Sequence, residues 1–251
     1  VRIASAVGLR NAATAEFLYD DTGRVWVLEV TARLQVEHGV PELVSGLDIV
    51  REQLWLAAGA RLSSAALAAA ERAAQPLGHA IEVRISLEDP ARAFAPTGGR
   101  VGRFTMAAGP GVRVDTALRA GEWVPPDYDP LVAKLIVHGQ DRPAAIDRLR
   151  RALDETEIDG VQTTLPFHRF VVRSPWFRSD DLSTGFVDEH WDGPASRSAA
   201  LERARLAVVL AESARAEPTN MEATNLEATN GTVRSAWRAA ARTDAIDRWP
   251  Q

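Results

Sequence analysis

Residues 28–39 (LEVTARLQVEHG) alternate regularly between apolar and polar side chains. In an extended strand, successive side chains point to opposite faces, so the two sets separate. The apolar set is Val30, Ala32, Leu34 and Val36, and the polar set is Glu29, Thr31, Arg33, Gln35 and Glu37. The pattern therefore predicts a strand with one entirely polar side. An ordinary amphipathic strand with solvated charges gives the same alternation, so the pattern alone leaves both interpretations open.

The stretch just before this strand predicts its partner. Residues 13–30 (ATAEFLYDDTGRVWVLEV) contain two apolar runs around an Asp-Thr-Gly turn, which is typical of a β-hairpin. With Thr22 and Gly23 at the centre of the turn, Glu16 lies opposite Glu29. Two facing carboxylates repel each other, and a magnesium ion with phosphate oxygens would remove that repulsion. A different turn type would shift the register and separate the two side chains.

The remaining pattern predicts an α+β chain with helices at both ends. Apolar positions at helical spacing from Leu47 end near Gly59, and a weak alanine-rich helix follows over residues 61–76. Strand-like runs at 79–89, 99–118 and 130–139 indicate a mostly antiparallel second unit. Asp141 can cap a helix that buries one apolar stripe, formed by Ile146, Leu149 and Leu153.

The C-terminal part of the chain has a different character. Residues 197–217 predict a helix, residues 218–231 repeat Thr-Asn and predict a linker, and residues 232–249 predict a last helix. We therefore expect three parts: a first domain portion over 1–75, a β-rich domain over 76–192, and a helical tail with a polar linker over 193–251.

Composition narrows the class of protein. The chain of 251 residues is 46% hydrophobic with a net charge of −5, which favours a globular protein and indicates neither a nucleic-acid nor a membrane surface. It has no cysteine, which fits a reducing compartment, so we expect a cytoplasmic protein. The sequence opens at Val1 within a helical pattern, which suggests a fragment. Its only lysine is Lys134.

Four segments carry a resemblance to a known family. Residues 17–59, which include RLQVEH followed by GLDIVREQ, are similar to the biotin carboxylase component of biotin-dependent carboxylases. The similarity continues through GHAIEVRISLEDP, VPPDYDPLVAKLIVHG and EIDGVQTTLPF, so it extends over about residues 1–190. The resemblance implies the C-terminal part of an ATP-grasp domain over 1–75, followed by the β-rich biotin carboxylase C-terminal domain.

The resemblance implies a metal site at the facing carboxylates. By position, Glu16 and Glu29 would hold Mg²⁺ or Mn²⁺ on the phosphates of ATP, and Thr31 would be a third oxygen ligand. The family usually has asparagine at the position of Thr31, and a hydroxyl is a shorter ligand, so we expect a weaker metal site. Further departures within the signature are Ala32, Gly39 and Pro41.

The rest of the polar set falls on the family's bicarbonate positions. Arg33, Gln35 and the backbone amide of Val36 match the groups that bind bicarbonate, and a guanidinium suits a planar oxyanion. Glu37 matches the general base that deprotonates bicarbonate. Arg84 matches an arginine that stabilises the enolate-like oxygen of biotin, a role that suits a permanently charged side chain.

Other polar residues have simpler interpretations. From the residues alone, Arg84 could equally form a surface ion pair with Glu82. His38 is expected to support structure, and Lys134 to make an internal ion pair. The glycine turns at 97–100 and 107–113 are not followed by the helix that a phosphate loop requires.

The implied activity needs more than this sequence contains. The family's glycine-rich lid and its phosphate-binding lysines are absent, as is a Met-Lys biotinylation site, so biotin must be on a separate carrier domain or chain. The implied partners are that carrier, a second biotin carboxylase protomer and a carboxyltransferase subunit. The final acceptor stays open among acyl-CoA, pyruvate and urea. The alternatives are another ATP-grasp ligase and a non-catalytic module that keeps only a dimerisation or partner-binding surface.

Overall fold

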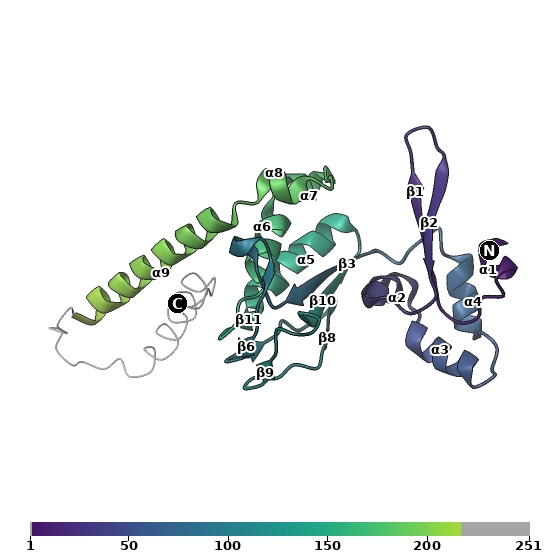
Figure 1. Cartoon of the computed structure of the whole chain (residues 1–251), viewed down its shortest axis with the longest axis horizontal. Helices are drawn as coiled ribbons and strands as arrows, with labels where there is room; N and C mark the ends of the chain where they lie inside the picture. The colour runs from purple at the N-terminus through teal and green to yellow at the C-terminus, as the bar shows by residue number, and fades with distance from the viewer. Residues whose placement is uncertain (1, 217–251) are drawn as a thin grey trace, which may run out of the picture. The chain divides into compact units, whose positions relative to one another are not determined.

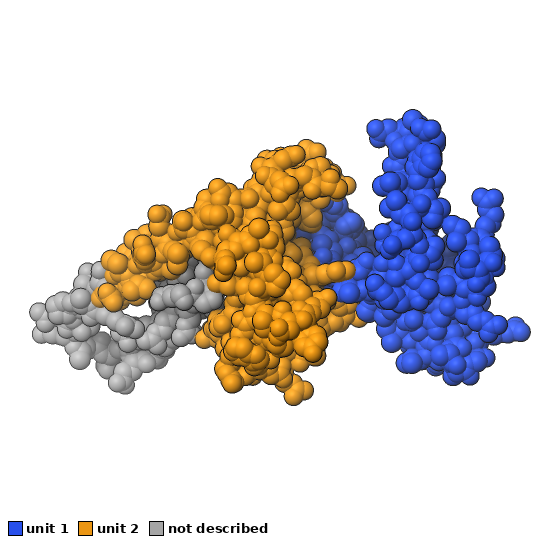
Figure 2. All heavy atoms as spheres, in the orientation of Figure 1, with its two compact units in different colours: residues 1–82, 136–148 blue, residues 83–135, 149–251 orange. Residues whose placement is uncertain are grey.

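A computed structural model of the chain describes residues 2–216 (Figure 1). The chain forms two compact units, coloured separately in Figure 2. Among the described residues, unit 1 comprises 2–82 and 136–148, and unit 2 comprises 83–135 and 149–216. The structure combines helices with short sheets, which confirms the predicted α+β class.

Residues 2–78 of unit 1 form a β-hairpin, four α-helices and one 3-10 helix. The hairpin strands are β1 (Thr14–Tyr19) and β2 (Val25–Thr31), and the helical elements are α1 (Arg2–Ala6), η1 (Val36–His38), α2 (Gly39–Ser45), α3 (Ile49–Ala57) and α4 (Ser64–Glu71). Local caps set the helix starts, because Asp48 Oδ1 accepts from Arg51 N at 2.8 Å and Ser63 Oγ accepts from Ala66 N at 3.0 Å. The predicted helices near Leu47 and in the alanine-rich segment are therefore confirmed.

The hairpin turn differs from the predicted one. Tyr19 pairs with Val25, and Asp20 N donates to Arg24 O at 3.1 Å, so the turn is centred on Thr22 and not between Thr22 and Gly23. Gly23 has a φ of 81°, the left-handed conformation that glycine adopts without strain. The predicted turn was wrong because the Asp20 side chain organises a longer loop.

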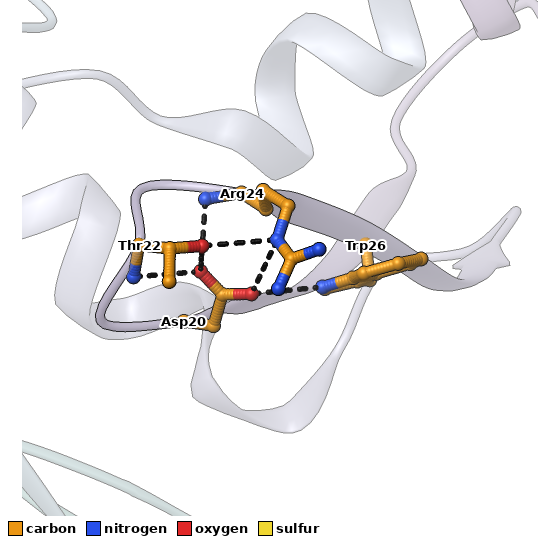
Figure 3. Close-up of polar contacts among 4 residues, drawn as sticks. All are labelled: Asp20, Thr22, Arg24 and Trp26. Atoms are coloured by element: carbon orange, nitrogen blue, oxygen red, sulfur yellow. Dashed lines mark hydrogen bonds and ion pairs between the residues drawn. The ribbon is translucent and has the colours of Figure 1, made fainter.

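Asp20 holds that loop together (Figure 3). Its Oδ1 accepts from the Thr22 hydroxyl at 2.5 Å and from Arg24 N at 3.0 Å, and its Oδ2 accepts from Arg24 Nε at 3.1 Å and Trp26 Nε1 at 3.4 Å. The bond from the Thr22 hydroxyl, followed by that from the Arg24 backbone, lowers the pKa of Asp20 to about 2. The loop is therefore stabilised by an ionised carboxylate.

Unit 2 contains the antiparallel strands that the sequence predicted. β11 (Glu157–Ile158) pairs with β7 (Phe104–Thr105), β4 (Glu88–Asp89) with β5 (Ala95–Pro96), and β6 (Gly99–Arg100) with β9 (Trp123–Val124), all antiparallel. A three-stranded sheet has the order β3-β10-β8, formed by β3 (His79–Ser86), β10 (Leu131–Gly139) and β8 (Val112–Thr116). The strand β3 begins in unit 1 and continues into unit 2, and β10 runs from unit 2 into unit 1.

Helix α5 (Arg142–Glu155) confirms the predicted cap and apolar stripe. Asp141 Oδ1 accepts from Ala144 N at 2.8 Å, and the side chains of Ile146, Leu149 and Leu153 are buried. The fully buried residues of unit 2 include Ile85, Leu87, Val101, Leu135 and Leu153. These side chains form its hydrophobic core.

Three helices of unit 2 that precede α9 (Gly193–Ala216) pack through aromatic rings. They are α6 (Leu165–Arg173), α7 (Pro175–Ser179) and α8 (Phe186–His190). A short 3-10 helix, η2 (Pro90–Arg92), lies between β4 and β5 in the sequence. The Phe167 ring lies 5.1 Å from Phe94 and 5.3 Å from Trp191, both edge to face. Such pairs add about 0.5–1.5 kcal/mol each beyond area burial, so they fix α6 on unit 2.

Helix α9 (Gly193–Ala216) confirms the predicted C-terminal helix, although it begins four residues earlier. Arg197 Nη2 lies 2.6 Å from Asp89 Oδ1, which anchors the start of the helix to η2 and β4. Farther along, Leu206, Val208, Val209 and Leu210 are exposed. The predicted linker at 218–231 and the predicted helix at 232–249 lie outside the described residues. Among residues 2–216, no helix is long and apolar enough to cross a membrane.

Candidate functional site

Glu16 and Glu29 lie directly opposite each other on β1 and β2. The predicted pairing is therefore confirmed, although the turn centre and the β-bulge that produce it were not predicted. The turn alone would have put the strands one residue out of register, but a β-bulge at Glu16/Phe17 restores the pairing. Both side chains are exposed on the hairpin of unit 1.

Two polar neighbours bind these carboxylates. Gln35 Nε2 donates to Glu16 Oε1 at 3.3 Å, and the Thr31 hydroxyl donates to Glu29 Oε1 at 3.0 Å. Four of the predicted site residues thus form a single cluster: Glu16, Glu29, Thr31 and Gln35.

The chemistry of this cluster fits a divalent cation. It presents carboxylate, hydroxyl and amide oxygens, which are hard ligands, and the two facing carboxylates carry like charges that a cation would neutralise. Within residues 2–216 there is no group of three or more His, Cys, Asp or Glu side chains arranged to hold a metal. A cation at the pair would be completed by other oxygen ligands, such as the Thr31 hydroxyl and the phosphates with which magnesium is usually bound.

The strand ends earlier than the alternating pattern predicts. β2 stops at Thr31, and residues 36–38 form η1, so Arg33 and Glu37 are not on a continued polar face of β2. The expectation that Glu29 to Glu37 lie on one polar side of an extended strand is therefore wrong beyond Thr31, because η1 and then α2 follow. Arg33 Nη1 donates to Leu34 O at 3.1 Å, and the Arg33 and Glu37 side chains are exposed. Val36 begins η1.

His38 supports this bend in the chain. Its Nδ1 lies 2.8 Å from Gln35 O, and because a carbonyl can only accept, the ring nitrogen donates. The bond links the end of η1 to the residue that contacts Glu16. His38 therefore has the structural role predicted for it.

Gly39 follows at a point of close packing within unit 1. A Cβ at this position would lie 2.3 Å from Ile136 Cδ1 and 3.2 Å from Glu82 Oε2, so a larger residue would force these side chains to move. Glu42, in the next turn, is buried and its Oε1 accepts from Ile49 N at 2.7 Å. The bond from Ile49 N to Glu42 connects α2 to the start of α3.

Arg84 lies on β3 within unit 2, next to the fully buried Ile85. The side chain is exposed, whereas its backbone carbonyl accepts from His168 Nε2 at 2.7 Å and from Thr164 Oγ1 at 3.1 Å. Sequence reasoning missed both partners. Pro166 marks the start of a helix there, but nothing in the sequence connects that helix to β3.

Lys134 is buried and its Nζ lies 3.0 Å from Asp115 Oδ2, which confirms the predicted internal ion pair. Arg113 also binds both oxygens of Asp115, at 2.8 and 2.9 Å. The single lysine of the chain is therefore part of the interior of unit 2.

Comparison with known proteins first defines the class. Residues 1–65 match the family "Carbamoyl-phosphate synthase L chain, ATP binding domain", which corresponds to the C-terminal part of an ATP-grasp domain. Residues 82–189 match the family "Biotin carboxylase C-terminal domain". The chain thus combines part of an ATP-binding domain with a second domain that is characteristic of biotin carboxylases.

Individual relatives lead to the same family. The chain is 42% identical over 189 residues to biotin carboxylase of Nostoc sp., covering 75% of this chain and 41% of the relative. It is also 43% identical over 190 residues to biotin carboxylase of Halalkalibacterium halodurans, covering 76% of this chain and 41% of the relative. The chain therefore matches the C-terminal part of biotin carboxylases and spans 41% of the length of these curated relatives.

Solved structures agree. The chain is similar, with a TM-score of 0.70 and 38% identity, to the biotin carboxylase domain of a thermophilic 2-oxoglutarate carboxylase bound to bicarbonate, covering 74% of this chain and 41% of that one. The same scores apply to the biotin carboxylase domain dimer of the Hydrogenobacter thermophilus 2-oxoglutarate carboxylase in complex with MgADP and bicarbonate, of which 40% is covered.

Proposed function

We propose that this chain contributes to the ATP-dependent carboxylation of carrier-bound biotin with bicarbonate. The observation that supports this most strongly is the facing pair of Glu16 and Glu29, with Gln35 and Thr31 bonded to it, in a chain that matches the C-terminal part of biotin carboxylases. In this reaction a bicarbonate oxygen attacks the terminal phosphate of ATP and displaces ADP, which forms carboxyphosphate. Carboxyphosphate then transfers its carboxyl group to the ureido nitrogen of biotin, and phosphate leaves with the proton of that nitrogen.

The chain's own residues have separate roles in this proposal. Glu16, Glu29 and Thr31 would hold Mg²⁺ or Mn²⁺, and the cation would offset the negative charge of the nucleotide phosphates. Gln35 and the Val36 amide orient bicarbonate. The metal and anion positions are therefore adjacent along the chain.

Arg33, Glu37 and Arg84 act on the anions. The Arg33 guanidinium has several N–H donors and uses one on Leu34 O, so it can also bind a planar oxyanion. Glu37 takes the proton of bicarbonate as general base. Arg84 stabilises negative charge on the ureido oxygen of biotin, a role for which its charge at every working pH is suited.

We further propose that the chain requires more polypeptide for this activity. Its one lysine is paired with Asp115 inside unit 2, so a phosphate-binding lysine must come from elsewhere. Preorganised contacts of that kind are worth about 3–4 kcal/mol each, so losing two lowers the rate by about four orders of magnitude or more. The proposed partners are the carrier of biotin, a second protomer and a carboxyltransferase subunit.

The test compares the chain alone with a reconstituted enzyme. The reconstituted enzyme is this chain fused to, or mixed with, the portion of the Nostoc relative that the chain does not match. We expect bicarbonate-dependent ATP cleavage and carboxylation of free biotin by the reconstituted enzyme only, and loss of both in Glu29→Gln. Robust carboxylation by the chain alone would overturn the requirement for more polypeptide. A well-folded but inactive reconstituted enzyme would favour a non-catalytic module.

A further inference from the structure

Two side chains of α6 hold the backbone of β3 around Arg84. The Arg84 carbonyl accepts from His168 Nε2 at 2.7 Å and from the Thr164 hydroxyl at 3.1 Å. The Thr164 hydroxyl accepts in turn from Ser86 N at 3.1 Å, and Thr164 N donates to Ser86 O at 3.1 Å. All of these residues belong to unit 2. The start of α6 therefore fixes β3 on both sides of Ile85.

Thr164 bonds through its hydroxyl to the backbone of β3 and not to the backbone of its own helix. It occupies the N-cap position of α6, where a threonine hydroxyl normally accepts from a backbone N–H of the first turn, a bond worth about 1 kcal/mol. No such capping bond is present at Thr164. The Thr164 hydroxyl binds β3, and at the helix start it is the Thr163 hydroxyl that accepts from Leu165 N, at 3.3 Å.

His168 is held firmly by the helix that carries it. Its neighbour Phe167 packs between Phe94 and Trp191, with ring centroids 5.1 and 5.3 Å away. One residue further on, the Arg169 guanidinium donates to Leu153 O at 2.9 Å and to Thr156 O at 2.9 Å. A rotation of α6 would break these contacts, so the imidazole has a fixed position from which to hold β3.

We propose that His168, together with Thr164, is a positioning residue for Arg84: the two side chains fix the backbone from which the guanidinium extends toward biotin. The inference rests on the proposed function, in which Arg84 stabilises charge on biotin. Its physical basis is that a displacement of about 1 Å at a reacting group can lower a rate about 100-fold. A guanidinium at the end of a long side chain is especially sensitive to the direction of its backbone.

The protonation state of His168 suits this role. Burial lowers the pKa of His168 to about 4, and the bond to the Arg84 carbonyl opposes that effect without cancelling it. Near neutral pH the ring is therefore uncharged, with its proton on Nε2, and it donates to the Arg84 carbonyl as a neutral group.

The test uses the reconstituted enzyme and two separate assays. Arg84→Ala should lower biotin carboxylation. His168→Ala should lower it by about tenfold to 100-fold and leave bicarbonate-dependent ATP cleavage unchanged. His168→Gln should restore most of the carboxylation, because its amide N–H can replace the Nε2 donor. His190→Ala is the matched control: this histidine of unit 2 stacks on Trp176 with centroids 3.9 Å apart, and its loss should not change carboxylation.

A double-variant cycle separates positioning from general support of the fold. In the Arg84→Ala background, His168→Ala should have little further effect on carboxylation. An equal further loss, or a loss of ATP cleavage, would overturn the positioning role. If Arg84→Ala lowers carboxylation and His168→Ala does not, the inference fails and the proposed function stands. If Arg84→Ala itself has no effect, the proposed role of Arg84 fails.

A measurement on the unmodified 251-residue chain covers the case in which His168→Ala does not fold. Nitrogen-15 NMR of the imidazole near pH 7 should show a neutral ring with the proton on Nε2. A proton on Nδ1 alone would overturn the proposal, because an unprotonated Nε2 cannot donate to the Arg84 carbonyl.

Discussion

Magnesium should protect the hairpin from local opening, and Glu29→Gln should abolish that protection. The facing carboxylates of Glu16 and Glu29 repel each other, and this repulsion opposes pairing of β1 with β2. A cation that binds the pair only in the closed hairpin stabilises it by mass action. For a Kd of about 1 mM and about 10 mM magnesium, the gain is about 1.4 kcal/mol, or about tenfold in the closed-to-open ratio.

Amide hydrogen exchange of residues 14–31 measures this ratio directly. In the wild-type chain, about 10 mM MgCl₂ should slow exchange of the hairpin amides about tenfold relative to sodium chloride of equal ionic strength. Glu29→Gln keeps an oxygen that can accept from Thr31 but loses the charge, so its exchange should not respond to magnesium. Without magnesium, relief of the repulsion should leave the variant hairpin at least as protected as wild type.

Asp21→Asn is the matched control for this experiment. It removes one carboxylate from the same exposed hairpin, in the turn and away from the Glu16–Glu29 pair. Its magnesium response should equal that of wild type. A Glu29→Gln chain that responds as strongly as wild type, or an equal loss in Asp21→Asn, would refute the assignment of the cation to the carboxylate pair.

Three further predictions follow from individual residues. Thr31→Asn restores the usual family residue, so half-maximal protection in the same exchange assay should need equal or less magnesium. Because the pKa of Asp20 is lowered from 3.8 to about 2, hairpin stability should fall as pH drops through that window, and Asp20→Asn should remove this dependence in exchange measurements. The pKa of His168 is lowered from 6.5 to about 4, so between these pH values the unfolded chain binds a proton at His168 that the folded chain does not. The free energy of unfolding should therefore fall by at most about 3 kcal/mol as the pH drops through this range. Denaturant titrations should measure this loss in the wild-type chain and show none in His168→Gln.

The sequence predicted correctly that Glu16 lies opposite Glu29, but it did not predict the turn centre or the β-bulge of the hairpin. Alternation and the Asp-Thr-Gly turn located both strands, and Glu16 was correctly placed opposite Glu29. The turn centre and the bulge were not predictable, because they depend on how the Asp20 side chain organises the loop against the twist of the strands. The shifted turn centre and the β-bulge each change the register by one residue, in opposite directions. Glu16 therefore still lies opposite Glu29.

The limits of the pattern are clearest after Thr31. Period-two alternation continues through Glu37, yet the backbone turns into η1 and α2. A short alternating run fits a strand or an irregular segment equally well, and only tertiary contacts such as the bond from Gln35 to Glu16 decide between them. The identity of the polar residues could thus be predicted, whereas their arrangement could not. The support of Arg84 by α6 was missed for the same reason, since about eighty residues separate the two.

The exposure of the hairpin supports the proposal that the activity needs more polypeptide than unit 1 provides. Residues on both faces of β1 and β2 are exposed, among them Phe17 at 49%, Trp26 at 53% and Val27 at 53%. An isolated two-stranded hairpin is marginally stable in water, and a like-charged pair weakens it further. A site that must hold a cation against nucleotide phosphates requires a rigid frame. Within residues 2–216, apolar side chains on both faces of the hairpin are exposed, so a second polypeptide surface that buries them would stabilise the carboxylate pair. This supports the proposal that the reconstituted enzyme, rather than the chain alone, is active.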